Sequence, residues 1–445
     1  MNKYKTKALK EDLRRKRLEA IKKNDQPIMT GVKLNYKGDD KVFNVYKIPL
    51  ECLVYNPYNG RIGTKVKTFE VNSRKLNPEI EEDILIIEEF LWDSKPDRNK
   101  KTLQSLLKDK QREYGIVSKN GYIIDGNRRA SLLNRINNQR DELGKKQDVS
   151  HAKYFNAIIL DDDADEKEIL KLETTYQMGR DEKLEYNATE KYLKTKRLID
   201  VGYTEDEIAI MMNTDKTTIN KNLQILELMD SYLSLYEYDQ MYAMLEKREG
   251  QFVDLNNYFK AYENRSGNAK TNWNPSDQDI NDMLIISFDY IRAQYEGKEF
   301  RTIAQNGKSS VPKSIFAHQD LWNEFKARHF KAVDSIEEKH VEDYLKKEDI
   351  DANIVDVLSN RDDEWTDVVL DSLKENLKRS KNKLELVQQS DRPYLLLEKA
   401  LNALKEIDLN QKGLFSEEAL ELIKEINSEA YYLRKSIDKE LKNNG

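Results

Sequence analysis

Cysteine and histidine are scarce in this chain of 445 residues. It has one cysteine, Cys52, and four histidines that are scattered along it: His151, His318, His329 and His340. A single thiol excludes a disulfide framework, and the histidine spacing excludes the familiar Cys/His zinc sites. These absences are typical of a protein in a reducing compartment, and we expect a cytoplasmic location.

Long hydrophobic runs are lacking as well. No apolar stretch reaches the roughly 20 residues of a membrane-spanning helix, and the N-terminus lacks the apolar segment of a signal peptide. We therefore expect neither membrane insertion nor export. Hydrophobic residues make up 38% and charged residues 35%, which indicates a folded, highly charged, helix-rich protein. The net charge of −6 argues against a polyanion-binding surface overall, but it allows local basic patches.

Basic residues crowd the first 26 positions: Lys3, Lys5, Lys7, Lys10, Arg14, Arg15, Lys16, Arg17, Lys22 and Lys23. We interpret residues 1–41 as a basic N-terminal arm, which is either a phosphate-binding tail or a solvated helix.

Strand patterns then give way to helical ones. Extended runs occupy positions 42–50 and 155–160, and Asn120-Gly121 predicts a hairpin that pairs 116–117 with 122–124. The acidic triplet 161–163 is expected to cap the next helix, and Asn187 with Glu190 has the form of a capping box. From about 170 onward helical periodicity dominates. We expect an α+β domain at 42–165, helical domains at 166–235 and 236–360, and a helical region at 361–445. Trp273, Trp322 and Phe325 are expected in a core.

The stretch Asp125-Gly126-Asn127-Arg128-Arg129 joins an expected strand to an expected helix. Two arginines at the start of a helix add positive charge to its unpaired N–H groups, which favours binding of an anion such as phosphate. Gly126 permits a close backbone approach at the turn. The alternative is a solvated arginine pair beside a turn.

Residues 203–229 form a second motif, two short helices joined by the turn 212–215. Thr204 is placed to cap the first helix and Asp215 the second. The second helix begins with cations and short hydrogen-bonding side chains, as a recognition helix in the major groove requires. The expected DNA-binding residues are Thr204, Lys216, Thr217, Thr218, Asn220 and Lys221. An ordinary helical hairpin is the alternative.

Apolar residues repeat at near-heptad spacing from Trp365 to the C-terminus, and Pro393 and Gly413 are expected to divide this region into separate helices. Packing within one chain and homodimerisation both fit this pattern.

Three segments in this order resemble the ParB family of partition proteins, within the wider ParB/sulfiredoxin-like fold. Residues 56–61, Asn-Pro-Tyr-Asn-Gly-Arg, are similar to the first family box, and 126–129, Gly-Asn-Arg-Arg, to its phosphate motif. Glu173, with Arg180 and Leu184 downstream, resembles the third box, and the helix-turn-helix follows it. The resemblance covers roughly residues 42–230 and implies an α+β ParB/sulfiredoxin-like domain, then an all-α helix-turn-helix domain and an α-helical C-terminal region.

The resemblance implies a DNA-binding clamp switched by a nucleoside triphosphate, CTP before ATP, with Mg²⁺. The implied nucleotide-binding residues are Arg61, Gly126, Asn127, Arg128, Arg129 and Arg180, and Glu173 is the implied Mg²⁺-side carboxylate. The implied partners are double-stranded DNA, a second copy of the chain and a partition ATPase that docks on the N-terminal arm.

The chain departs from the family pattern at two box positions. Asn127 stands where the phosphate motif has glutamate, and Thr174 where the third box has asparagine. Because a carboxylate that could orient water or metal is missing, we expect nucleotide binding rather than efficient hydrolysis, with slow CTPase activity as the enzymatic possibility. The alternatives are a ParB-fold kinase or nuclease, and a transcriptional regulator with a vestigial nucleotide site.

Overall fold

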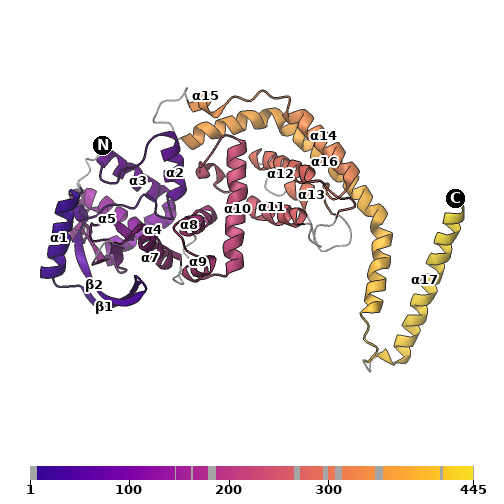
Figure 1. The fold of residues 1–445 in the computed structure, drawn as a ribbon, viewed down its shortest axis with the longest axis horizontal. Coiled ribbons are helices and arrows are strands. Elements are labelled where there is room, and N and C mark those ends of the chain that lie inside the picture. Colours follow the sequence, from indigo (N-terminus) through magenta and orange to yellow (C-terminus); the bar gives the residue numbers. More distant parts are fainter. Residues whose placement is uncertain are drawn as a thin grey trace.

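The computed structural model describes residues 8–145, 147–161, 164–178, 187–264, 271–293, 299–305, 313–345, 354–410 and 414–443. A sheet-containing N-terminal part is followed by a central group of helices, and the C-terminal end of the chain projects from it (Figure 1). This arrangement confirms an α+β part followed by an all-α part. None of the helices in the described ranges has the length and apolar character to cross a membrane.

The N-terminal sheet has five strands in the order β1-β2-β5-β3-β4. Their bounds are β1 (Met29–Tyr36), β2 (Asp39–Pro49), β3 (Gly115–Val117), β4 (Ile123–Asp125) and β5 (Tyr154–Ile159). Only β3 and β5 pair in parallel, and the other neighbours are antiparallel. The β3–β4 pairing confirms the hairpin predicted from Asn120-Gly121.

Strand residues alternate between two buried faces, because successive side chains of a strand point to opposite sides. Phe155 and Ala157 lie in one core, together with Leu18, Ile87 and Leu133. Ile158 and Val45 lie in a second core with Leu172. The helices of this part are α1 (Glu11–Asn24), α2 (Gly63–Asn72), α3 (Glu81–Asp93), α4 (Pro96–Asp109), α5 (Asn127–Asn138), α6 (Arg140–Leu143) and α7 (Glu166–Met178). The short 3₁₀ turns η1 (Leu50–Cys52) and η2 (Ser150–Lys153) complete it.

The N-terminal segment is docked rather than extended as an arm. Leu18 and Ile21 of α1 are buried against the sheet domain. Arg14 is buried too, and its guanidinium donates to the carbonyl oxygens of Leu9 and Asn120 and to Glu79. Since β1 is also a strand of the sheet, the boundary that we placed at residue 41 is wrong, because the sheet domain begins well before it.

Three helices and a 3₁₀ turn form the helix-turn-helix region and its surroundings: α8 (Ala188–Asp200), α9 (Glu205–Met211), α10 (Lys216–Leu235) and η3 (Tyr242–Leu245). Thr204 caps α9 in a capping box with Glu207, and Asp215 caps α10 by accepting from the Thr218 N–H, as predicted. The second half of α10 enters the core of the all-α region, where Leu228 and Tyr232 are buried.

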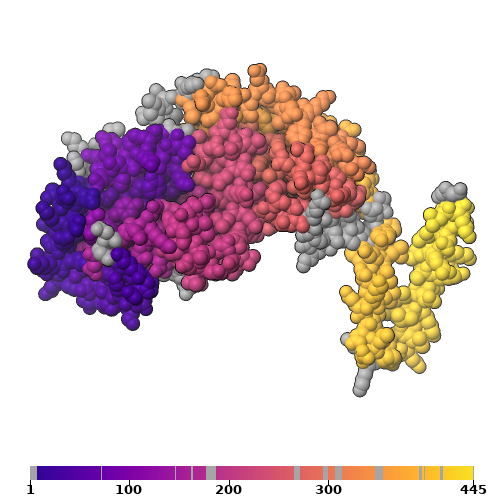
Figure 2. Space-filling view, viewed as in Figure 1, coloured from indigo at the N-terminus to yellow at the C-terminus, as the bar shows by residue number. Residues whose placement is uncertain are grey.

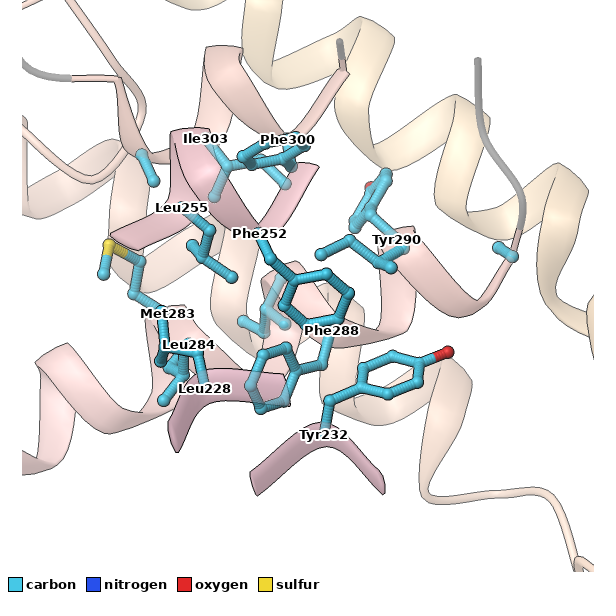
Figure 3. Close-up of a cluster of buried hydrophobic side chains, with 14 of the residues drawn as sticks. Leu228, Tyr232, Phe252, Leu255, Met283, Leu284, Phe288, Tyr290, Phe300 and Ile303 are labelled. Carbon is cyan, nitrogen blue, oxygen red and sulfur yellow. The ribbon is translucent and has the colours of Figure 1, made fainter. Parts of the chain in front are cut away.

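The all-α region has one core of aromatic and aliphatic side chains, seen around Phe252 and Phe288 in Figure 3. It is formed with α11 (Glu249–Glu263), α12 (Asp277–Arg292), α13 (Glu299–Ala304), α14 (Gln319–Val333), α15 (Val341–Leu345) and the first half of α16 (Ile354–Lys405). Trp322 and Phe325 are fully buried and Trp273 packs against the cluster, which confirms their assignment to a core. The boundary at 360/361 falls inside α16, with Leu358 and Trp365 in the same core.

The C-terminal helices extend beyond this core. Helix α16 continues through Pro393, so our expectation that this proline ends a helix is wrong. Proline removes one backbone hydrogen bond and favours a kink, and a helix can tolerate that loss where water can reach the freed carbonyl. The last helix, α17 (Glu417–Asn443), stands away from the rest (Figure 2). Gly413, the other expected break, lies outside the described residues.

Candidate functional site

The predicted first box forms a loop that is fixed by side chains from the hairpin and from α5. The Asn56 side-chain oxygen accepts from the Tyr122 hydroxyl at 2.6 Å and from the Tyr58 N–H at 2.9 Å. Asn127 then clamps the Asn56 backbone, accepting from its N–H at 3.2 Å and donating to its carbonyl at 2.7 Å. Asn127, which stands where the phosphate motif of the family has glutamate, therefore holds two of the predicted motifs together.

Gly126 makes the turn between β4 and α5 possible. Its φ is +110°, and a Cβ at this position would lie 2.5 Å from the Phe155 ring. A non-glycine residue would meet both backbone strain and a steric clash here.

The two arginines that follow this turn diverge. Arg129 donates to Asp125 at 2.8 Å and to the Glu113 carbonyl at 2.8 Å, which ties α5 to the strand ends. Arg128 is buried and lines a cavity together with Arg61. Of the two arginines predicted to bind one anion together, Arg129 therefore stabilises the fold and Arg128 lies at the cavity.

This cavity, which we name the arginine cavity, has a volume of about 70 Å³. Segments far apart in the sequence line it: Gly60, Arg61, Thr64, Lys65, Ser94, Lys95, Arg98, Arg128, Asn187, Glu190, Tyr242, Ala243 and Glu246. Five of these side chains are basic and two are acidic, so the lining carries a positive balance. The volume admits a few water molecules or one phosphate-sized anion, but not a nucleoside.

Two buried carboxylates face the backbone beside the arginine cavity. Glu190 of α8 accepts from the Thr64 N–H at 2.7 Å, at the N-terminus of α2. Glu173 of α7 accepts from the Gly60 N–H at 3.1 Å, and its other oxygen lies 2.8 Å from the Lys194 ammonium. Burial raises the pKa of Glu190 above its ordinary value. A carboxylate therefore already occupies the anion position that the start of α2 offers.

A second, larger cavity of about 630 Å³ adjoins the first, and both are lined by Gly60, Glu190 and Tyr242. Tyr58, Lys67 and Asp230 are among its other lining residues. Burial lowers the pKa of Lys67 and raises that of Asp230. The volume lies in the range of small-molecule sites, roughly 300–1,000 Å³.

The arrangement of Glu173 does not fit the Mg²⁺ role that the resemblance implies, because an ammonium group and a backbone N–H already contact its oxygens. Within the described ranges, no group of three or more His, Cys, Asp or Glu side chains is placed to hold a metal ion. Arg180 and Leu184 lie outside the described residues. Of the acidic triplet 161–163, the structure describes Asp161, which pairs with Lys22 and does not cap α7. Asp165 takes the capping role, because its side chain accepts from the Glu168 N–H of α7.

The helix-turn-helix residues lie at the outer end of α10. Lys216 and Thr217 are exposed, and Thr218, Asn220 and Lys221 are half-buried. The Lys216 ammonium lies 3.0 Å from Asp206 and 3.3 Å from Glu205, and these contacts raise its pKa. The hydroxyl of Thr204 is engaged in its capping box. Acidic side chains in the first turn of α9 therefore neutralise part of the expected DNA-facing charge.

Several residues of the arginine cavity lie outside every predicted motif. Lys95 and Arg98 are two of them, although Pro96 at the start of α4 is a recognisable first-turn signal. Asn187 does cap α8 through the Thr189 N–H, but Glu190 caps α2 instead of its own helix. No local pattern predicts that second role.

Neither the models of known protein families nor the curated protein sequences match this chain.

Proposed function

We propose that this chain is a DNA-binding protein whose N-terminal domain binds a nucleoside triphosphate, CTP before ATP, as a conformational switch. The observation that supports nucleotide binding is the arginine cavity. Arg61 and Arg128 both line it, and its lining has more basic than acidic side chains. A phosphate group fits its size and charge, and the adjoining cavity of about 630 Å³ has room for a nucleoside.

The lining also supports the idea of a switch. The residues that line the arginine cavity come from different parts of the fold: the first-box loop, α4, α5, α8 and the turn η3. A ligand that contacts all of these groups would bind best in one arrangement of them, and would shift the population toward it. Mg²⁺ would be carried by the triphosphate oxygens, since Glu173 is paired with Lys194.

The DNA half is proposed from the helix-turn-helix geometry of α9 and α10, with Lys216, Thr217 and Lys221 at or near the exposed start of the second helix. Partition of plasmid, phage or chromosome DNA, or a related DNA transaction, is the setting that the family resemblance suggests. A partition ATPase is a proposed partner on the same ground.

Isothermal titration of the full chain with CTP, ATP and inorganic triphosphate, each with Mg²⁺, tests the nucleotide half. We expect Arg128→Ala to weaken binding at least about tenfold, because a charge-assisted contact to phosphate is worth ~1.5–3 kcal/mol. Arg129→Ala is the matched control: it should lower the unfolding temperature through loss of the Asp125 contact, yet leave affinity nearly unchanged. If none of the three ligands binds the wild-type chain, with or without DNA, the nucleotide proposal fails.

A further inference from the structure

The side chain of Lys67 lines the cavity of about 630 Å³ beside the arginine cavity, which we call the larger cavity. Lys67 belongs to α2 and is half-buried. Among the residues that the structure describes, none forms a hydrogen bond or an ion pair with its ammonium group, and the ring centre of Tyr242 lies 5.5 Å from Nζ. Because a partly buried charge without such a partner is unfavourable, we expect this amine to contact a ligand.

Tyr242 brings a carboxylate to the same part of the larger cavity. Its hydroxyl donates to Asp230 Oδ1 at 2.6 Å, while its ring faces Lys67. Burial lowers the pKa of Lys67 although Asp230 attracts its charge, and burial also raises the pKa of Asp230. A lysine that loses its proton readily is a better nucleophile, and a carboxyl that keeps its proton longer is a better acid at neutral pH.

The arginine cavity indicates which molecules would reach this amine. Gly60, Glu190 and Tyr242 line both cavities, so one ligand can extend from the first into the second. The arginine cavity has the size and the positive lining for one phosphate group. A phosphate bound there would leave the rest of a small molecule in the larger cavity, which Lys67 and Asp230 line.

We propose that Lys67 forms an imine with an aldehyde that carries a phosphate group. The nitrogen of the neutral amine adds to the carbonyl carbon, and a C=N bond replaces the C=O bond. Both hydrogens of the amine leave with the carbonyl oxygen as water, and the Asp230 carboxyl passes protons from the nitrogen to the oxygen. The amine part of this proposal is independent of nucleotide binding, whereas its phosphate contact rests on the anion site of the proposed function.

Reductive labelling of the full chain tests the proposal. Pyridoxal 5′-phosphate is a phosphorylated aldehyde and pyridoxal is its phosphate-free counterpart; borohydride fixes each imine as a secondary amine, which peptide mass spectrometry locates. With less aldehyde than protein, pyridoxal 5′-phosphate should label Lys67 at least about tenfold faster than Lys101, an exposed lysine of α4. Lys67→Arg should abolish the imine absorption of the complex, and the matched control Lys101→Arg should retain it.

The two aldehydes separate the amine from the phosphate contact. Pyridoxal 5′-phosphate should label Lys67 about tenfold faster than pyridoxal does, and Arg128→Ala should remove that advantage. If neither aldehyde labels Lys67 faster than Lys101, the reactive amine is overturned. Equal labelling of Lys67 by both aldehydes overturns the phosphate contact. If the chain binds no nucleotide but keeps the selective labelling of Lys67, the nucleotide proposal fails and the imine site stands.

Discussion

Replacing Glu190 by glutamine should strengthen anion binding in the arginine cavity. In the Glu190→Gln variant the side-chain amide oxygen can still accept from the Thr64 N–H, so the cap on α2 is retained while one negative charge leaves the cavity lining. Two unit charges roughly 6 Å apart interact by about 3 kcal/mol at an effective dielectric constant of ~20. That energy corresponds to about a hundredfold in the dissociation constant, and water entering the open side of the cavity would reduce the gain to about tenfold.

The pH dependence of this gain has a definite sign. Burial raises the pKa of Glu190, so its carboxyl stays neutral to a higher pH than an ordinary glutamate does and ionises as the pH rises through that raised pKa. Wild type and variant should therefore bind equally at acidic pH and diverge as the pH increases. Comparing the two proteins at each pH removes the titration of the ligand itself. By the same linkage, the wild type should lose folding free energy over this pH range and the variant should not.

Isothermal titration with CTP, ATP and inorganic triphosphate provides the measurement. Glu246→Gln is the matched control: this carboxylate lines the same cavity but is exposed, so solvent screening should keep its effect below about threefold. The reasoning is refuted if Glu190→Gln, folded as judged by its unfolding temperature, binds triphosphate no better than the wild type at any pH at which both proteins are folded.

Three further outcomes are expected. Lys221→Ala should weaken DNA binding and reduce its salt dependence by about one counterion, whereas Lys216→Ala should do less, because two neighbouring carboxylates already offset that charge; filter binding across a salt series measures both. Asp83 of α3 is buried and accepts from the Arg74 guanidinium at 2.6 Å, so Asp83→Asn should lower the free energy of unfolding by about 1–3 kcal/mol at neutral pH. Since this hydrogen bond lowers the pKa of Asp83, urea titrations should show the difference shrinking as the pH falls below ~4. Gly126→Ala should cost about 1–3 kcal/mol in the same assay, because its Cβ would strike Phe155; an unchanged midpoint would contradict the clash.

Features that depend on neighbouring residues were predictable from the sequence. The β3–β4 hairpin follows from Asn120-Gly121, and the caps at Thr204 and Asp215 follow from side chains that reach three residues along the chain. In each case the hydrogen-bond partners lie close together in the sequence, so the local pattern contains the information.

Features that depend on residues far apart in the sequence were not predictable from it. Arg14 looked like one cation among many, but it is buried by contacts to Asn120 and Glu79. Glu190 looked like a cap for its own helix, but its partner is Thr64, 126 positions away. The composition of the arginine cavity is of this second kind, because it depends on which segments the fold brings together and not on any motif within one of them.

Helix α10 has its outer half in the helix-turn-helix and its inner half in the all-α core. A cut between 235 and 236 would strip the inner half of the helix of its apolar neighbours, so expressing the two sides as separate fragments should give poorly soluble material. Limited proteolysis should accordingly leave this junction intact. For the same reason, if a bound duplex displaced the outer end of α10, the displacement would also change the packing of the aromatic side chains around its inner end.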